Sequence, residues 1–196
     1  METFFRISTA LVLVCVCATS FYFRRRANLK GGKLRSQEGQ RPLAWLRLLA
    51  LIIWIPILAY LINPDLISGL RVALPDWVRV VGLVAIAVDS VLVFWMFRSL
   101  DTNITPVHEA RENAKLVTSG PYRWIRHPLY AFGFALLVSL ALVTGIWWLA
   151  ACAAIFIGFF ALWRVPKEEA KLIEVFGDAY RQYMGRTGRF LPKFRT

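Results

Sequence analysis

The most restrictive feature of the sequence is an uncharged stretch that occupies residues 128–163. A single helix over this stretch would measure about 54 Å at 1.5 Å per residue, which exceeds the roughly 30 Å hydrocarbon core of a bilayer. A small water-soluble core could not bury so much apolar surface. We therefore predict two short membrane-spanning helices that turn near Thr144-Gly145.

Three further apolar runs, at residues 4–23, 43–62 and 77–97, are each long enough to cross a bilayer. The chain is 58% hydrophobic with a formal charge of +12, a combination typical of membrane proteins. Its basic residues lie between the apolar runs rather than along one soluble face, which argues against a nucleic-acid partner. The predicted fold is an all-α integral membrane bundle of five transmembrane helices with a cytoplasmic amphipathic C-terminal helix.

The distribution of arginine and lysine predicts the orientation of this bundle. Segment 24–41 is rich in basic residues, whereas segment 63–76 holds only Arg71. By the positive-inside rule the first segment is a cytoplasmic loop and the second lies outside. The N-terminus is then outside, while segment 98–127 and the C-terminal tail are cytoplasmic. The first apolar run precedes its basic cluster and lacks a small-residue cleavage site, which favours a retained anchor over a signal peptide.

The tail after Arg164 is too polar to span a membrane. Pro166 suits the first position of a new helix, and Glu168 and Glu169 would lie in its first turn, where the helix dipole favours acids. Gly177-Asp178 is expected to divide this helix, with Asp178 capping the second part. One apolar face follows from residues at helical spacing: Leu172, Ile173, Phe176, Tyr180 and Tyr183.

Arg126, His127 and Pro128 lie where a polar loop enters the uncharged stretch. Pro128 suits the first helical turn, and a helix N-terminus beside an arginine and a histidine is a natural place for an anion. The alternative is an arginine that snorkels and a histidine that sits at the interface. The neighbouring aromatic residues have the same two interpretations, a pocket or an aromatic belt: Tyr122, Trp124 and Tyr130.

Arg164 and Glu168 lie at the other cytoplasmic junction, four residues apart. One interpretation is a pocket wall that offers a cation to a bound carboxylate and an anion to a bound amine. The alternative is a positive-inside arginine followed by an acid that the helix dipole favours. Asp89 lies well inside an apolar run, where an acid is costly, and we expect it to make an interhelical hydrogen bond rather than to take part in chemistry.

Other kinds of site lack their usual residues. Cys15, Cys17 and Cys152 all lie inside apolar runs and show no spacing relation to His108 or His127. Neither a metal site nor a disulfide framework is therefore predicted. The sequence contains no dinucleotide-binding glycine motif after a strand, no P-loop and no zinc-protease motif.

Three separated blocks resemble a known family. These are LVTSGPY at residues 116–122, RHPLY at residues 126–130, and the tail RVPKEEAKLIEVFGDAYRQYMGRTGRFLP at residues 164–192. In this order they are similar to the integral-membrane isoprenylcysteine carboxyl methyltransferases, in particular their compact prokaryotic-type members, and to the related phospholipid methyltransferases. The resemblance divides the chain into an N-terminal three-span region, residues 1–97, and a methyltransferase catalytic region, residues 98–196.

The resemblance implies a pocket for S-adenosylmethionine that the C-terminal helix closes, with Arg164 holding the substrate carboxylate and Glu168 meeting the cofactor amine. It implies no metal and no nucleic-acid partner. The lipophilic or prenylated substrate would enter from the membrane lipid. The family commonly has a histidine two residues before the Leu-Val pair, and Ala114 occupies that position here. The implied cofactor-binding residues are Lys115, Leu116, Val117, Gly120, Tyr122, Arg126, His127, Tyr130, Glu168 and Glu169.

Chemistry favours a carboxylate as the methyl acceptor. A carboxylate is already ionised at neutral pH, so that its methylation requires alignment, desolvation and an orienting cation rather than a general base. An amine acceptor would have to lose a proton, and His127 is the nearest base. Three alternatives stay open: a phospholipid or amine N-methyltransferase, a membrane reductase that uses a nicotinamide cofactor, and a non-catalytic membrane scaffold.

Overall fold

The computed structural model describes residues 1–30, 43–101 and 116–193. These residues form helices and turns, with two isolated β-bridges and no strand. The predicted all-α fold is therefore confirmed for the described part of the chain. The elements in chain order are α1 (Glu2–Lys30), α2 (Leu43–Ile62), η2 (Pro64–Leu70), α3 (Asp76–Leu100), η4 (Gly120–Arg123), α4 (Pro128–Thr144), α5 (Trp147–Phe159), η5 (Phe160–Arg164), α6 (Val165–Phe176) and α7 (Asp178–Arg186).

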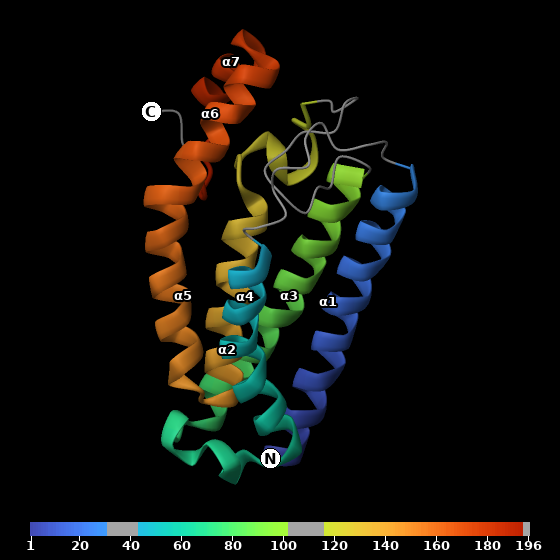
Figure 1. Cartoon of the computed structure of the whole chain (residues 1–196). Coiled ribbons are helices and arrows are strands. Elements are labelled where there is room, and N and C mark those ends of the chain that lie inside the picture. The colour runs from blue at the N-terminus through green and yellow to red at the C-terminus, as the bar shows by residue number, and fades with distance from the viewer. Residues whose placement is uncertain (31–42, 102–115, 194–196) are drawn as a thin grey trace.

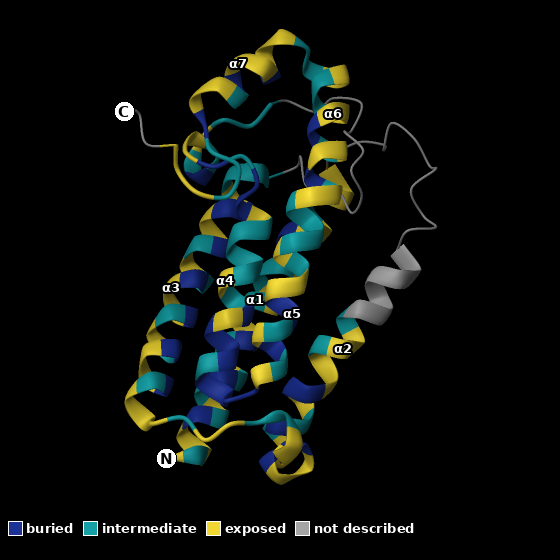
Figure 2. Cartoon of the chain, turned by 90° about the vertical axis from the view of Figure 1, so that its left-hand side faces the viewer, coloured by how far each residue is buried: buried dark blue, intermediate teal, exposed yellow. Residues whose placement is uncertain are grey.

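Helices α1 to α5 run side by side, and α6 and α7 extend beyond one end of the bundle (Figure 1). Three helical segments are long and apolar enough to cross a membrane: Glu2–Lys30, Asp76–Leu100 and the continuous Trp147–Phe176. Two shorter apolar helices accompany them, Ala50–Ile62 and Pro128–Thr144. Buried residues face the interior and exposed ones line the outer faces (Figure 2). Many of the exposed residues are large and apolar, as expected of surfaces that face lipid.

The turn predicted near Thr144-Gly145 is confirmed. Gly145 ends α4 in the left-handed region, with φ of 75°, and its N–H donates to the carbonyl of Ala141. Its carbonyl accepts the N–H of Val72 at 2.8 Å. A side chain at Gly145 would lie 2.5 Å from the carbonyl oxygen of Val72, so both the backbone angle and the close approach favour glycine.

The predicted helix break before Pro166 is wrong. Helix α5 continues through a π-helical segment, η5, directly into α6, and Arg164 and Val165 both keep right-handed helical angles. Proline has no N–H to donate, and its ring crowds the carbonyl four residues before it. The wider turn of a π-helix relieves that conflict without ending the helix.

Gly177 divides α6 from α7 as predicted, with φ of 57°. The expected cap is wrong, because Gly177 itself occupies the N-cap position and no side-chain cap bond forms. The carboxylate of Asp178 accepts a hydrogen bond from Arg181 at 2.8 Å instead. The division therefore depends on a glycine conformation rather than on an acidic cap.

Helix α3 lies at the centre of the packing, against α1 and α4. Gly82 allows α3 and α4 to approach closely, since a Cβ there would lie 2.7 Å from the Cβ of Leu142. Asp89 is 3% exposed on α3. Within the described residues neither of its carboxylate oxygens has a hydrogen-bond partner. The interhelical hydrogen bond predicted for Asp89 is thus absent from this part of the structure.

Candidate active site

The segment before α4 pairs with the segment after α7. The N–H of Arg126 donates to the carbonyl of Gly188 at 2.8 Å, and the N–H of Gly188 donates to Trp124 at 3.0 Å. The N–H of His127 donates to the carbonyl of Arg189 at 3.1 Å. This backbone pairing brings the end of the tail over the entry to α4.

Glu169 lies at the centre of a buried ion cluster. Its Oε1 accepts a hydrogen bond from Arg126 Nε at 2.9 Å and lies 3.3 Å from His127 Nε2. Its Oε2 accepts from Arg189 Nη2 at 2.7 Å. Burial alone would raise the pKa of Glu169, but hydrogen bonds from His127, Arg189 and Arg126 lower it to about 2. Glu169 is therefore ionised and already compensated.

Arg126 also binds the end of α7 and the residue that follows it. Its Nη1 donates to the carbonyl of Met184 at 3.2 Å and to the carbonyl of Thr187. The guanidinium thus joins the segment entering α4, the N-terminal part of α6 and the end of α7. Such a multidentate arrangement uses the fixed fork geometry of arginine.

A second polar group adjoins the ion cluster. The Tyr130 hydroxyl donates to Glu168 Oε2 at 2.9 Å and accepts from Arg164 Nε at 3.3 Å. His127 Nδ1 lies 4.0 Å from Glu168 Oε2. The side chains of Arg164 and Glu168 are only part-buried. These contacts place a cation and an anion on either side of one phenol.

Aromatic rings surround the polar groups. Tyr130 packs on Phe160 with ring centroids 4.7 Å apart, and the guanidinium of Arg164 lies 5.6 Å from the centre of the same ring. Phe190, which follows the pairing of the tail with α4, lies 6.3 Å from the rings of His127 and Phe134. Aromatic faces of this kind attract cationic ligands.

Tyr122 also faces this region. Its carbonyl accepts a hydrogen bond from the Tyr183 hydroxyl at 2.7 Å, which fixes η4 against α7. Burial, followed by the charges of Tyr183, Glu168 and Tyr130, raises the pKa of Tyr122 well above its ordinary value. The phenol therefore stays protonated and can donate a hydrogen bond.

Of the residues predicted for the site, seven come together here: Tyr122, Arg126, His127, Tyr130, Arg164, Glu168 and Glu169. Leu116 and Val117, before η4, and Gly120, its first residue, are half-buried, and within the described residues no hydrogen bond or ion pair joins them to the cluster. Lys115 and Ala114 lie outside the described residues.

Sequence reasoning missed Arg189 and Phe190, which lie just before the Leu191-Pro192 pair that ends the third sequence block. Their position inside the third sequence block, residues 164–192, was the only feature of the sequence that could have indicated a role in the site. Among the described residues no group of histidine, cysteine, aspartate and glutamate could hold a metal ion. The side chains present are chemically complementary to an amine, a carboxylate and a cationic centre.

Comparison with known proteins supports the resemblance noted from the sequence. A family model described as phospholipid methyltransferase matches residues 77–179. The protein-S-isoprenylcysteine O-methyltransferase of Xenopus laevis is 29% identical over 124 residues, which cover 59% of this chain and 41% of the relative. The Homo sapiens protein of the same description is 30% identical over 120 residues, which cover 59% of this chain and 42% of the relative.

The chain thus spans about two fifths of the length of these curated relatives. The family match runs from the first turn of α3 to the first turn of α7. It includes the residues of α4 and α6 that form both polar groups of the site. Because this match covers more than half of the chain, the protein belongs to the phospholipid methyltransferase family, with isoprenylcysteine O-methyltransferases among its relatives.

Proposed function

We propose that the chain is a membrane methyltransferase that transfers a methyl group from S-adenosylmethionine to the carboxylate of a lipophilic, isoprenylcysteine-like substrate. Family membership supports methyl transfer, and the names of both relatives, protein-S-isoprenylcysteine O-methyltransferases, support a prenylated cysteine as the acceptor. The observation that carries the proposal is the connection from Arg164 through Tyr130 to Glu168. Through this connection the Glu168 carboxylate, which could bind the amine of the cofactor, lies close to the Arg164 guanidinium, which could bind the carboxylate of the acceptor. Both residues lie just beyond the end of the apolar helix α5.

We further propose that α1 to α5 each cross the membrane. The apolar segments Ala50–Ile62 of α2 and Pro128–Thr144 of α4 are shorter than the three long segments, but α4 packs against α3 and α5, and α2 lies beside the same bundle (Figure 1). The concentration of basic residues in segment 24–41 supports a cytoplasmic position for the candidate active site and for α6 and α7. The N-terminus would then lie outside. In this arrangement residues 1–97 support the catalytic region, residues 98–196.

The side chains present fit S-adenosylmethionine. Glu168 offers a carboxylate to its amine, and the phenol of Tyr122 can donate to its carboxylate. The rings of Tyr130, His127 and Phe160 offer faces to its sulfonium. Glu169 is already paired, and its proposed role is to hold Arg126 and His127 in place. The backbone of Leu116 and Val117 and the residue Lys115 complete the proposed binding set.

The acceptor is held by the residues at the junction of α5 and α6. When bound, S-adenosylmethionine supplies a methyl group on a sulfonium, which a carboxylate oxygen takes while the sulfur leaves with the electron pair of the broken bond. No proton has to move, so no general base is required. Arg164 uses Nε for Tyr130, and its remaining N–H groups can orient the acceptor carboxylate in a bidentate fashion.

Calorimetric titration of the purified protein with S-adenosylhomocysteine tests cofactor binding. Glu168→Ala should weaken binding by about tenfold or more, the loss expected for a charge-assisted hydrogen bond to the ligand. Arg126→Ala should also weaken binding, because Glu169 would lose the buried cation that fixes the ion cluster. Glu174→Ala and Arg123→Ala are matched controls, because both side chains are exposed. No binding to the folded parent protein would contradict the proposal.

A second candidate is methylation of an amine, which the description of the family model favours. His127 is the base that could accept the proton, since it lies between Glu168 and Glu169. Transfer of a radiolabelled methyl group to membrane extracts, followed by base treatment, separates the two. A methyl ester releases labelled methanol, whereas a methylamine keeps the label.

A further inference from the structure

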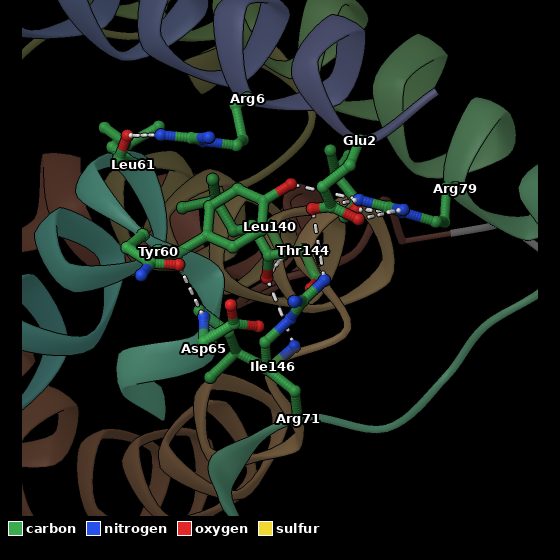
Figure 3. Close-up of polar contacts among 12 residues, drawn as sticks. Glu2, Arg6, Tyr60, Leu61, Asp65, Arg71, Arg79, Leu140, Thr144 and Ile146 are labelled. Carbon is green, nitrogen blue, oxygen red and sulfur yellow. Dashed lines mark hydrogen bonds and ion pairs between the residues drawn. The ribbon is translucent and has the colours of Figure 1, made fainter. Parts of the chain in front are cut away.

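A polar pocket lies at the end of the bundle opposite the candidate active site. Its volume is about 320 Å³, and it is formed by the start of α1, η2, the start of α3 and the turn between α4 and α5. Figure 3 shows that several of its polar side chains converge from these elements. The proposed methyl transfer uses none of them. The polar lining residues are Glu2, Asp65, Ser68, Arg71, Arg79 and Thr144.

Arg79 forms the inner wall of this pocket and is 7% exposed. Its Nη1 donates to Glu2 Oε2 at 2.9 Å, its Nη2 donates to the Tyr60 hydroxyl at 3.0 Å, and its Nε donates to the carbonyl of Val143 at 2.8 Å. The guanidinium also lies 4.0 Å from the centre of the Phe5 ring. The charges of Glu2 and Arg79 therefore neutralise each other, and these hydrogen bonds hold this wall of the pocket in one position.

Arg71 lies nearer the mouth of the pocket. Its Nε donates to the carbonyl of Thr144 at 3.0 Å and its Nη2 donates to Glu2 Oε1 at 3.1 Å. Within the described part of the chain no acceptor is found for its Nη1. This edge of the guanidinium can therefore bind an anionic oxygen from outside.

Asp65 and Ser68 line the same mouth and are both exposed on η2. The backbone N–H of Asp65 donates to the side chain of Asn63 at 3.0 Å, which holds the start of η2 in place. The mouth thus presents a cation, a hydroxyl and a carboxylate on a fixed backbone. A simple anion would be repelled by Asp65 and a simple cation would be repelled by Arg71. A zwitterion can place its negative group against Arg71 and its positive group against Asp65.

The surroundings of the pocket indicate a lipid. Trp77 is 70% exposed on α3, and the exposed Trp147 donates its indole N–H to the carbonyl of Gly69 at 3.4 Å. Tryptophan is enriched at the level of lipid headgroups. Val72, which lines the pocket, and Leu66, which follows Asp65 in the chain, are exposed apolar residues. A headgroup in the pocket would leave its acyl chains against apolar surface.

We propose that this pocket binds the headgroup of a zwitterionic aminophospholipid from the leaflet opposite the candidate active site. The phosphate lies against Arg71 and Ser68, and the ammonium lies against Asp65. The lipid joins η2, α3 and the α4–α5 turn at the end of the bundle. This site is independent of the proposed methyl transfer.

Native mass spectrometry of the full-length protein released from detergent micelles tests the proposal. The added probes are palmitoyl-oleoyl phosphatidylethanolamine, the phosphatidylglycerol with the same acyl chains, and free phosphoethanolamine. Arg71→Gln and Asp65→Asn should each reduce retention of phosphatidylethanolamine by about tenfold, which is the loss of one charge-assisted contact. Arg123→Gln and Asp178→Asn are the matched controls, because both residues are exposed at the other end of the molecule.

Phosphatidylethanolamine should be retained in preference to phosphatidylglycerol, and free phosphoethanolamine should bind far more weakly than the lipid. Equal retention by the parent and both pocket variants overturns the proposal, as does equal retention of the two lipids. Free phosphoethanolamine that binds as tightly as the lipid shows a site for a soluble ligand instead. If Arg71→Gln does not fold, the result for Asp65→Asn decides whether the proposal holds, because substitution of the exposed Asp65 should leave folding intact. Binding of S-adenosylhomocysteine should be unchanged in Asp65→Asn.

Discussion

Arg126 and Glu169 form an ion pair, with Nε and Oε1 2.9 Å apart, that joins the N-terminal part of α6 to the segment entering α4. Both side chains are at least nine-tenths buried, with exposures of 9% and 4%. A buried pair is not by itself a source of stability, but removal of one partner leaves an uncompensated charge. Folding of the candidate active site should therefore be sensitive to the loss of either partner of this pair.

Glu169→Ala should destabilise the protein by about 3 kcal/mol, because Arg126 would stay buried without its carboxylate. Thermal unfolding of the purified protein in detergent measures the change. Glu174→Ala serves as the control, since Glu174 is exposed on the same helix. A melting temperature for Glu169→Ala equal to that of the control would show that the ion cluster contributes nothing to folding.

Tyr130→Phe should weaken binding of S-adenosylhomocysteine by about tenfold while the fold is kept, because it removes one hydroxyl that bonds two charged groups. The ring contact with Phe160 is retained in this variant. Calorimetry of binding and the melting temperature together separate the two effects. Tyr22→Phe is the matched control on an exposed tyrosine of α1. Unchanged affinity would remove Tyr130 from the proposed binding set.

Gly188→Ala should impair both folding of the tail and cofactor binding. A Cβ at Gly188 would lie 1.7 Å from the carbonyl oxygen of Leu191, so the tail would have to move away from Arg126 and Trp124. Limited proteolysis should then cleave the tail at lower protease concentrations than in the parent. Gly185→Ala is a suitable comparison, because nothing lies within 4 Å of a Cβ there. Equal protease resistance of the two variants is the contrary result.

Local features of the fold could be predicted from the sequence. The turn at Gly145 and the division at Gly177 each depend on one glycine whose position interrupts an apolar pattern. Pro128 begins α4 because proline suits the first position of a helix, where no N–H has to be donated. The continuity of α5 into α6 could not be predicted in this way. The spacing of apolar residues around a proline in a π-helical turn does not differ from the spacing around a proline that starts a new helix.

The candidate site was only partly predictable for a similar reason. Arg126, His127, Glu168 and Glu169 are concentrated at two helix junctions, and family resemblance connects those junctions. Arg189 reaches Glu169 only because the tail turns back and pairs with the entry to α4. That pairing involves two residues far apart in the chain, and hydropathy patterns carry no information about it.

The two arginines that bind Glu169 should contribute unequally. Arg126→Gln should lower the melting temperature more than Arg189→Gln, because the Arg189 side chain is 40% exposed and its pair is accessible to solvent and salt. Arg126 additionally loses its bonds to the carbonyls of Met184 and Thr187. Repetition of both measurements in high salt should shrink the effect of Arg189→Gln and leave that of Arg126→Gln nearly unchanged. An Arg189→Gln effect as large as that of Arg126→Gln at either salt concentration would mean that burial does not decide the strength of these pairs.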